Sequence, residues 1–124
     1  LAPLHPRTVK NLENFVLTLP VTVLPPQGYL EFLALEKAAQ FVITDSGGVQ
    51  EETCTLGVPC VTVRKTTDLP ETVTAGSNLL AGTTREGMSA AFSKAPSIAR
   101  GWKNPYGDGH AASSITDYLI QHLP

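Results

Sequence analysis

Short runs of β-branched and other apolar residues alternate along the chain with stretches that have helical periodicity. The pattern predicts strands at residues 1–4, 21–24, 41–44, 60–63 and 78–81, and helices at residues 8–16, 29–39, 48–56 and 85–94, from residue 70 and before the C-terminus. Strands that alternate with helices of this length form βαβ units. The sequence therefore predicts an α/β fold with a doubly wound parallel sheet, in which ligands bind at the turns after strands.

Individual residues make the predictions for two of these helices more specific. Thr8 is a residue type that caps helix N-termini, so we expect it to cap the first helix. The helix at residues 29–39 is apolar nearly all round, and Glu31, Glu36 and Lys37 are predicted to face outward.

The turn after the third strand reads Asp-Ser-Gly-Gly at residues 45–48 and opens a helix. A helix N-terminus presents unsatisfied N–H groups at the positive end of the helix dipole, which favours an anion. Gly47 and Gly48 lack the Cβ atoms that would hold a phosphate away, and Ser46 can donate to the same anion or cap the helix instead. The turn is neither a Walker A loop nor G-x-G-x-x-G, and a simple tight turn explains it equally well.

Two glutamates follow within the same helix. Val49, Thr53 and Leu56 share the arc that should face the sheet, Glu51 points to solvent, and Glu52 lies about 60° from that arc. A carboxylate would repel phosphate, but it accepts hydrogen bonds from a pair of sugar hydroxyls. Both acids can instead serve only the helix dipole, the interpretation that we adopt for Glu51. With Glu52 as a ribose ligand, the turn predicts a nucleotide-sugar site.

Composition limits the alternatives. The 124 residues have a net charge of −2, with 42% hydrophobic and 16% charged residues, as in one globular domain or part of one. No basic cluster is present, which argues against nucleic acid and against an anionic membrane surface as partners. No apolar run approaches the roughly 18 residues that span a bilayer. Cys54 and Cys60 match no zinc or redox spacing, so we expect buried thiols and no metal site.

Six segments carry a more specific signal: PLHPRT (3–8), GYLEFLAL (28–35), DSGGVQEE (45–52), LGVP (56–59), VRKTTDLPETVTAG (63–76) and NPYGDG (104–109). In this order they resemble the non-hydrolysing UDP-N-acetylglucosamine 2-epimerases. The resemblance covers essentially the whole chain and implies two Rossmann-like domains in a GT-B arrangement. Residues 1–124 would be part of the C-terminal, UDP-binding domain, with the N-terminal catalytic domain outside this chain.

The resemblance also implies roles for individual residues. Residues 46–48 would bind the UDP diphosphate, and Glu52 the ribose. Tyr29 and Phe32 would border the uracil, although core packing explains Phe32 equally well. His5 and Arg64 would line the cleft, with a structural role for His5 and an exposed arginine without a role as the alternatives.

The family's reaction interconverts UDP-GlcNAc and UDP-ManNAc by elimination and re-addition of UDP, without nicotinamide or a required metal. The resemblance implies that the whole protein is a cytoplasmic isomerase of polysaccharide precursor synthesis. It also implies a homo-oligomer, and specifically a homodimer. Its proton-transfer carboxylates are expected outside this chain, so the isolated chain should be inactive. Leu69 and Lys65 depart from the family pattern, which leaves the sugar open. A non-catalytic nucleotide-sugar-binding module and a fragment of a GT-B glycosyltransferase are the alternatives.

Overall fold

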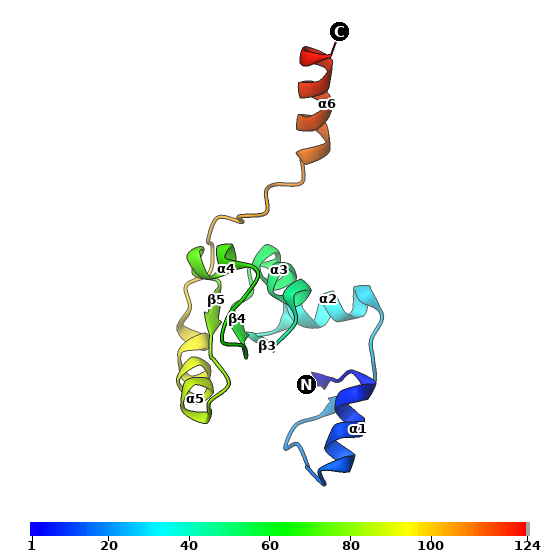
Figure 1. The fold of residues 1–124 in the computed structure, drawn as a ribbon, viewed down its shortest axis with the longest axis vertical. Coiled ribbons are helices and arrows are strands. Elements are labelled where there is room, and N and C mark those ends of the chain that lie inside the picture. The colour runs from blue at the N-terminus through cyan, green and yellow to red at the C-terminus, as the bar shows by residue number, and fades with distance from the viewer. Residues whose placement is uncertain (124) are drawn as a thin grey trace. The chain divides into compact units, whose positions relative to one another are not determined.

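A computed structural model describes residues 1–123, and the chain divides after Leu35 into two compact units. In the first unit, β1 (Ala2–Pro3) pairs in parallel with β2 (Val23–Leu24), and α1 (Pro6–Asn14) connects them (Figure 1). His5, rather than Thr8, caps α1, because its Nδ1 accepts the N–H of Arg7 at 3.2 Å. The expected cap at Thr8 was therefore wrong. Helix α2 (Tyr29–Ala38) follows and runs into the second unit.

The second unit contains a three-stranded sheet with the order β3-β4-β5, and all three strands are parallel. Its elements are β3 (Val42–Thr44), α3 (Gly47–Leu56), β4 (Cys60–Thr62), α4 (Pro70–Thr74), β5 (Asn78–Leu80), α5 (Arg85–Lys94), the 3-10 turn η1 (Ala95–Ser97) and α6 (Ala111–His122). Gly57 ends α3 in the left-handed conformation at φ 72°, which glycine adopts without strain. The α/β class with a parallel sheet is confirmed.

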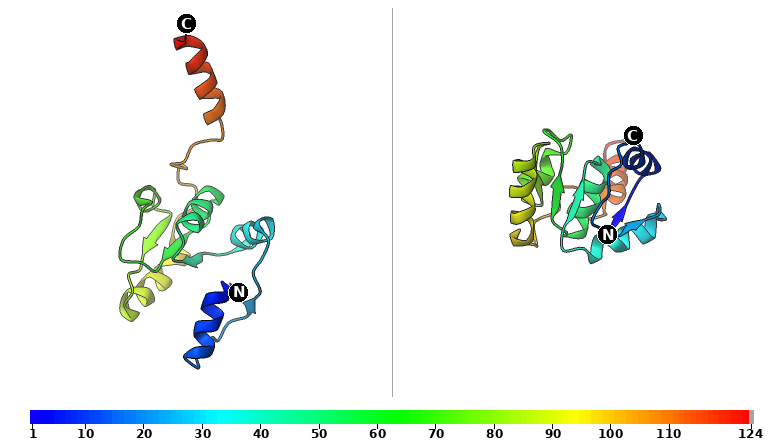
Figure 2. Two further views of the ribbon diagram at one scale, coloured as in Figure 1. Left: turned by 45° about the vertical axis from the view of Figure 1, so that its right-hand side comes forward. Right: turned by 90° about the horizontal axis from the view of Figure 1, so that it is seen from below.

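The two faces of this sheet differ in chemistry, because successive side chains of a strand point to opposite sides. Val61, in the middle of β4, packs with Ala81, Ala91 and Ala95 in the apolar core beneath α5. The neighbours of Val61 along the strand, Cys60 and Thr62, are also fully buried, but they face α3 and α4. Figure 2 shows α5 and α3 on opposite sides of the sheet.

Three further expectations need correction. The strands form two separate sheets, because no backbone hydrogen bonds join β1 or β2 to β3–β5 in residues 1–123. Glu36 is only 3% exposed and does not face outward. On α3 the fully buried side chains are Gln50, Thr53 and Cys54, so the buried arc is rotated from the predicted one.

Two other expectations can be compared directly with the structure. Cys54 and Cys60 are buried free thiols, as predicted. Among the described residues, none of the helices is both long and apolar enough to span a bilayer.

Candidate functional site

The carboxyl ends of β3 and β4 form one edge of the sheet. Thr44 and Thr62 are register partners at these ends, and the N–H of Val63 donates to the carbonyl of Thr44 at 2.9 Å. Ser46 and Arg64 each follow their strand by two residues, so the chain leaves the sheet at the same edge in both places. In open parallel sheets this edge is where ligands bind.

The glycine turn, residues 46–48, opens α3 at this edge. Neither Gly47 nor Gly48 has a positive φ, so the backbone conformation does not require glycine at either position. A Cβ built on Gly47 would lie 3.9 Å from Cδ1 of Leu69, and one on Gly48 would lie 3.9 Å from Oγ of Ser46, both ordinary contacts. Nothing in the described chain therefore explains two glycines, a residue type of poor helix propensity, in the first turn of this helix.

The polar groups of this turn are open to a ligand. Ser46 is the N-cap residue, but its hydroxyl makes no capping hydrogen bond, which removes the capping alternative. Its backbone N–H donates to Oγ1 of Thr44 at 3.0 Å. The N–H groups of Gly47, Gly48 and Val49 find no acceptor within residues 1–123. These donors and the hydroxyl can bind an anion such as a diphosphate.

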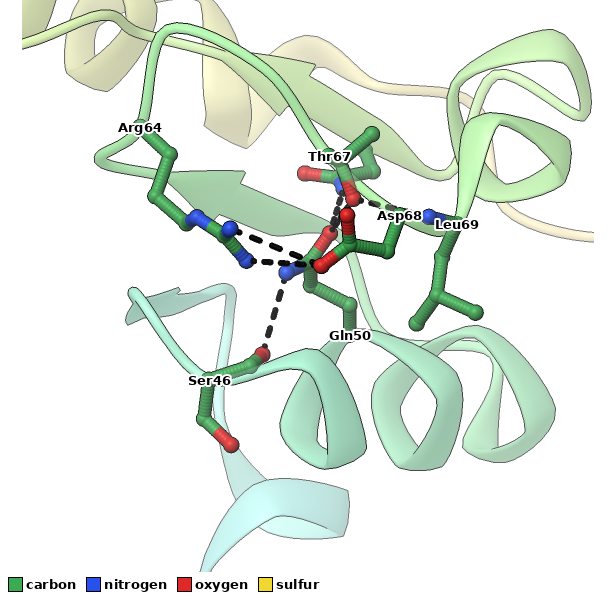
Figure 3. A network of polar contacts seen from close by, with 7 residues as sticks. Ser46, Gln50, Arg64, Thr67, Asp68 and Leu69 are labelled. Carbon is green, nitrogen blue, oxygen red and sulfur yellow. Dashed lines mark hydrogen bonds and ion pairs between the residues drawn. The ribbon is translucent and has the colours of Figure 1, made fainter.

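Gln50 connects the glycine turn to the loop that follows β4. Its side chain is fully buried, and its Nε2 donates to the carbonyl of Ser46 at 3.1 Å (Figure 3). Its Oε1 accepts from Oγ1 of Thr67 at 2.6 Å and from Nδ2 of Asn78 at 3.1 Å. One amide therefore joins α3, the loop and β5.

Arg64 opens the loop at residues 64–69, which we call the 64–69 loop. Its guanidinium lies 3.5 Å from Oδ2 of Asp68, and Figure 3 shows the two side chains facing each other. The Asp68 side chain is 87% exposed, so this ion pair is weak and screened by solvent. The guanidinium is free to exchange Asp68 for a phosphate, which it binds through paired donors.

Glu52 lies one helical turn beyond Gly48 and is half-buried, whereas Glu51 is exposed as predicted. A second carboxyl, Glu36 of α2, approaches it. Both oxygens of Glu36 are buried without a hydrogen-bond partner within residues 1–123. Burial, and to a smaller extent the Glu52 carboxylate, raise the pKa of Glu36 to about 7. Glu36 is therefore protonated or ionised according to pH near neutrality.

The other predicted site residues belong to the unit of residues 1–35. His5 caps α1 and is exposed. Tyr29 and Phe32 lie three positions apart on α2 and so share a helix side. Tyr29 is 65% exposed and Phe32 is half-buried. An exposed aromatic ring has a face available for stacking on a base, and half-burial leaves both interpretations of Phe32 open.

Residues 104–109 form a turn that Asn104 organises. Its Nδ2 donates to the carbonyl of Gly107 at 3.1 Å, and its Oδ1 accepts the N–H of Tyr106 at 3.0 Å. Gly107 and Gly109 have φ values of 97° and 88°, which side chains rarely adopt. These glycines therefore serve the turn itself.

Sequence reasoning missed Gln50, Thr67 and Asn78. Gln50 shares a helix side with Thr53 and Cys54, three and four residues on, and this spacing was the available signal. Its partners lie 17 and 28 residues away along the chain. Only the folded sheet brings them together.

The fold and this edge define the class of protein: a parallel α/β unit with open donors at the carboxyl end of its sheet. The family model for UDP-N-acetylglucosamine 2-epimerases matches residues 1–120. The chain belongs to the UDP-N-acetylglucosamine 2-epimerase family.

Individual relatives agree with this assignment. A UDP-N-acetylglucosamine 2-epimerase of Methanococcus maripaludis is 46% identical over 124 residues, which cover 95% of this chain and 34% of that protein. A UDP-2,3-diacetamido-2,3-dideoxy-D-glucuronate 2-epimerase of Pseudomonas aeruginosa is 44% identical over 96% of this chain and 34% of its own length. The chain therefore spans about a third of the length of the curated relatives that it matches.

Solved structures give the same result for the fold. The structure of Methanocaldococcus jannaschii UDP-GlcNAc 2-epimerase in complex with UDP-GlcNAc and UDP matches with a TM-score of 0.84 and 44% identity. The match covers 96% of this chain and 34% of that one. A parallel α/β unit of this kind is thus known within a UDP-GlcNAc 2-epimerase.

Proposed function

We propose that this chain is the C-terminal, UDP-binding part of an enzyme that epimerises a UDP-sugar at C2. The glycine turn is the observation that carries the proposal, because neither its conformation nor its packing explains Gly47 and Gly48. The open N–H groups and the free Ser46 hydroxyl suit the diphosphate, Arg64 adds a positive charge at the same edge, and Glu52 accepts from the ribose hydroxyls. Membership of the family and the UDP complex of the Methanocaldococcus jannaschii relative support this proposal.

Epimerisation of UDP-GlcNAc to UDP-ManNAc, through elimination and re-addition of UDP, is the finer part of the proposal. General acid–base groups must reach the proton at C2 within hydrogen-bond distance, and we assign none of them to this chain. The Pseudomonas aeruginosa relative is named for another UDP-sugar, so UDP is what the relatives' names have in common. The cytoplasmic location and the homo-oligomeric state stay predictions.

Calorimetric titration of the chain with UDP tests the proposal. Wild-type chain should bind UDP, and Glu52→Gln should weaken binding about tenfold because it removes a charged acceptor. Glu51→Gln, at the exposed neighbouring position, is the matched control and should bind like wild type. Failure of the wild-type chain to bind UDP would overturn the proposal.

A modified ligand locates the Glu52 contact. If Glu52 accepts from the ribose, 2′-deoxy-UDP should bind wild type more weakly than UDP, and Glu52→Gln should barely change its affinity further. Equal losses for both ligands in Glu52→Gln would place the Glu52 contact elsewhere on the nucleotide.

A further inference from the structure

One side-chain hydrogen bond joins the 64–69 loop to helix α3 within residues 1–123. Lys65, Thr66 and Asp68 are exposed, whereas Thr67 and Leu69 are half-buried, and the Thr67 hydroxyl donates to Oε1 of Gln50 at 2.6 Å. No other hydrogen bond joins residues 65–69 to α3 within residues 1–123. The polar attachment of the loop to α3 therefore rests on this bond, with the half-buried Leu69 beside it.

Thr67 also shapes the loop from within. The same Oγ1 accepts the N–H of Leu69 at 3.1 Å, which closes a tight turn before α4. The side chain of Leu69 extends toward the glycine turn, since a Cβ on Gly47 would lie 3.9 Å from its Cδ1. Loss of the hydroxyl would therefore release both the bridge to Gln50 and the turn that directs Leu69.

The Gln50 side chain, which accepts the hydrogen bond from Thr67, is itself held in place by other hydrogen bonds. Asn78 donates to its Oε1, and Asn78 is held in turn by Oγ1 of Thr62 at 2.8 Å and Oγ1 of Thr72 at 3.0 Å. All four side chains are at most 2% exposed. A fully satisfied buried network of this kind fixes one arrangement of its members. On its other side, the Gln50 amide donates to the carbonyl of Ser46.

We propose that Gln50 and Thr67 are positioning residues that hold the 64–69 loop, and with it Arg64, against the glycine turn, so that both present one preformed surface to a nucleotide diphosphate. Figure 3 shows the Gln50 amide between Ser46 and Thr67, and Arg64 close to the same amide. Preformed surfaces bind more tightly because less freedom is lost on binding. This inference rests on the proposed function.

Variants at two adjacent threonines test the inference. Thr67→Val removes the hydroxyl at nearly constant shape, Thr67→Ser keeps it, and Thr66→Val makes the same chemical change at an exposed position with no hydrogen bond in residues 1–123. In the ligand-free chain, hydrogen exchange of residues 65–69 should be faster in Thr67→Val only. UDP should bind Thr67→Val about tenfold more weakly, with wild-type affinity in Thr67→Ser and Thr66→Val.

A double-mutant cycle with Arg64→Ala asks whether the loop acts through Arg64. If Thr67 positions Arg64, Thr67→Val should weaken UDP binding by about threefold or less in the Arg64→Ala background, against about tenfold in wild type. A merely structural role for Thr67 predicts the same loss in both backgrounds, and that result would overturn the inference.

The remaining outcomes separate this inference from the proposed function. A wild-type chain that does not bind UDP overturns the proposed function and this inference with it. A wild-type chain that binds UDP, with unchanged loop exchange or unchanged affinity in Thr67→Val, overturns the positioning role alone.

Discussion

Helices α3 and α5 begin in opposite ways on the two faces of one sheet. At α5, the Thr84 hydroxyl accepts the N–H of Gly87 at 3.1 Å, and a Cβ on Gly87 would clash with the carbonyl oxygen of Ala81. At α3, Ser46 makes no cap, and a Cβ on either glycine would make only an ordinary contact. A glycine in the first turn of a helix thus serves packing in one case and leaves backbone accessible in the other.

The faces beneath these helices follow the same division. The α5 side is built from alanines and Val61, whereas the α3 side carries Gln50, Asn78 and two threonines in a satisfied network. A further buried polar group, the carboxyl of Glu36, lies near Cys60 and Glu52 and has no hydrogen-bond partner in residues 1–123. Four predictions test this division, from the largest expected effect to the smallest.

Ionisation of Glu36 should destabilise the α3 side of the sheet. Its pKa is about 7 in the folded chain against 4.5 for an ordinary glutamate, so the stabilising protonated form is complete below pH 4.5 and is lost as the pH rises through 7. The free energy of unfolding should therefore fall by about 3 kcal/mol across this window relative to Glu36→Gln, measured by urea denaturation. Glu31→Gln, at an exposed position of the same helix, should follow wild type, and parallel curves for Glu36→Gln and wild type would contradict the prediction.

Gly87→Ala should destabilise the chain by about 2 kcal/mol, because the added methyl group meets backbone that cannot move aside. Urea denaturation measures the loss. UDP affinity of the folded variant should equal that of wild type, since Gly87 belongs to the α5 side. Unchanged stability would show that α5 shifts to accept the methyl group.

Gly48→Ala should have the opposite effects: UDP affinity should fall, and stability should not. The Cβ has room within the protein, so stability should stay constant or rise by up to about 1 kcal/mol, as helix propensity predicts. UDP binding measured by calorimetry should weaken more than tenfold, because the methyl group occupies the approach of the diphosphate. Wild-type affinity in Gly48→Ala would refute the diphosphate position and would leave these glycines unexplained.

The sequence predicts most of the elements, because their signals are local. The bounds of α5 agree with the periodicity, and Gly57 ends α3 as a single residue type indicates. The sheet edge that gathers Ser46 and Arg64 also follows from strand order. These features need only neighbours in the chain or the general geometry of parallel sheets.

Buried polar residues are what the sequence did not reveal. Glu36 and Gln50 occupy helix positions where a polar side chain ordinarily indicates solvent. Gln50 is buried because Thr67 and Asn78 satisfy its carbonyl oxygen, and both come from other elements. Glu36 is buried with no such compensation in residues 1–123, and no pattern in the sequence marks it. Whether a polar side chain is buried or exposed thus depends on partners that only the fold brings together.

The two capping residues give the smallest and most direct test of the comparison. Thr84→Ala should cost about 1 kcal/mol of stability, since it removes the hydrogen bond to the N–H of Gly87. Ser46→Ala removes no cap, so its stability in urea should stay within about 0.5 kcal/mol of wild type. Its UDP affinity should fall about threefold if the free hydroxyl donates to the diphosphate. A stability loss in Ser46→Ala as large as that in Thr84→Ala would mean that Ser46 caps α3 in solution, and the contrast between the two helix starts would then disappear.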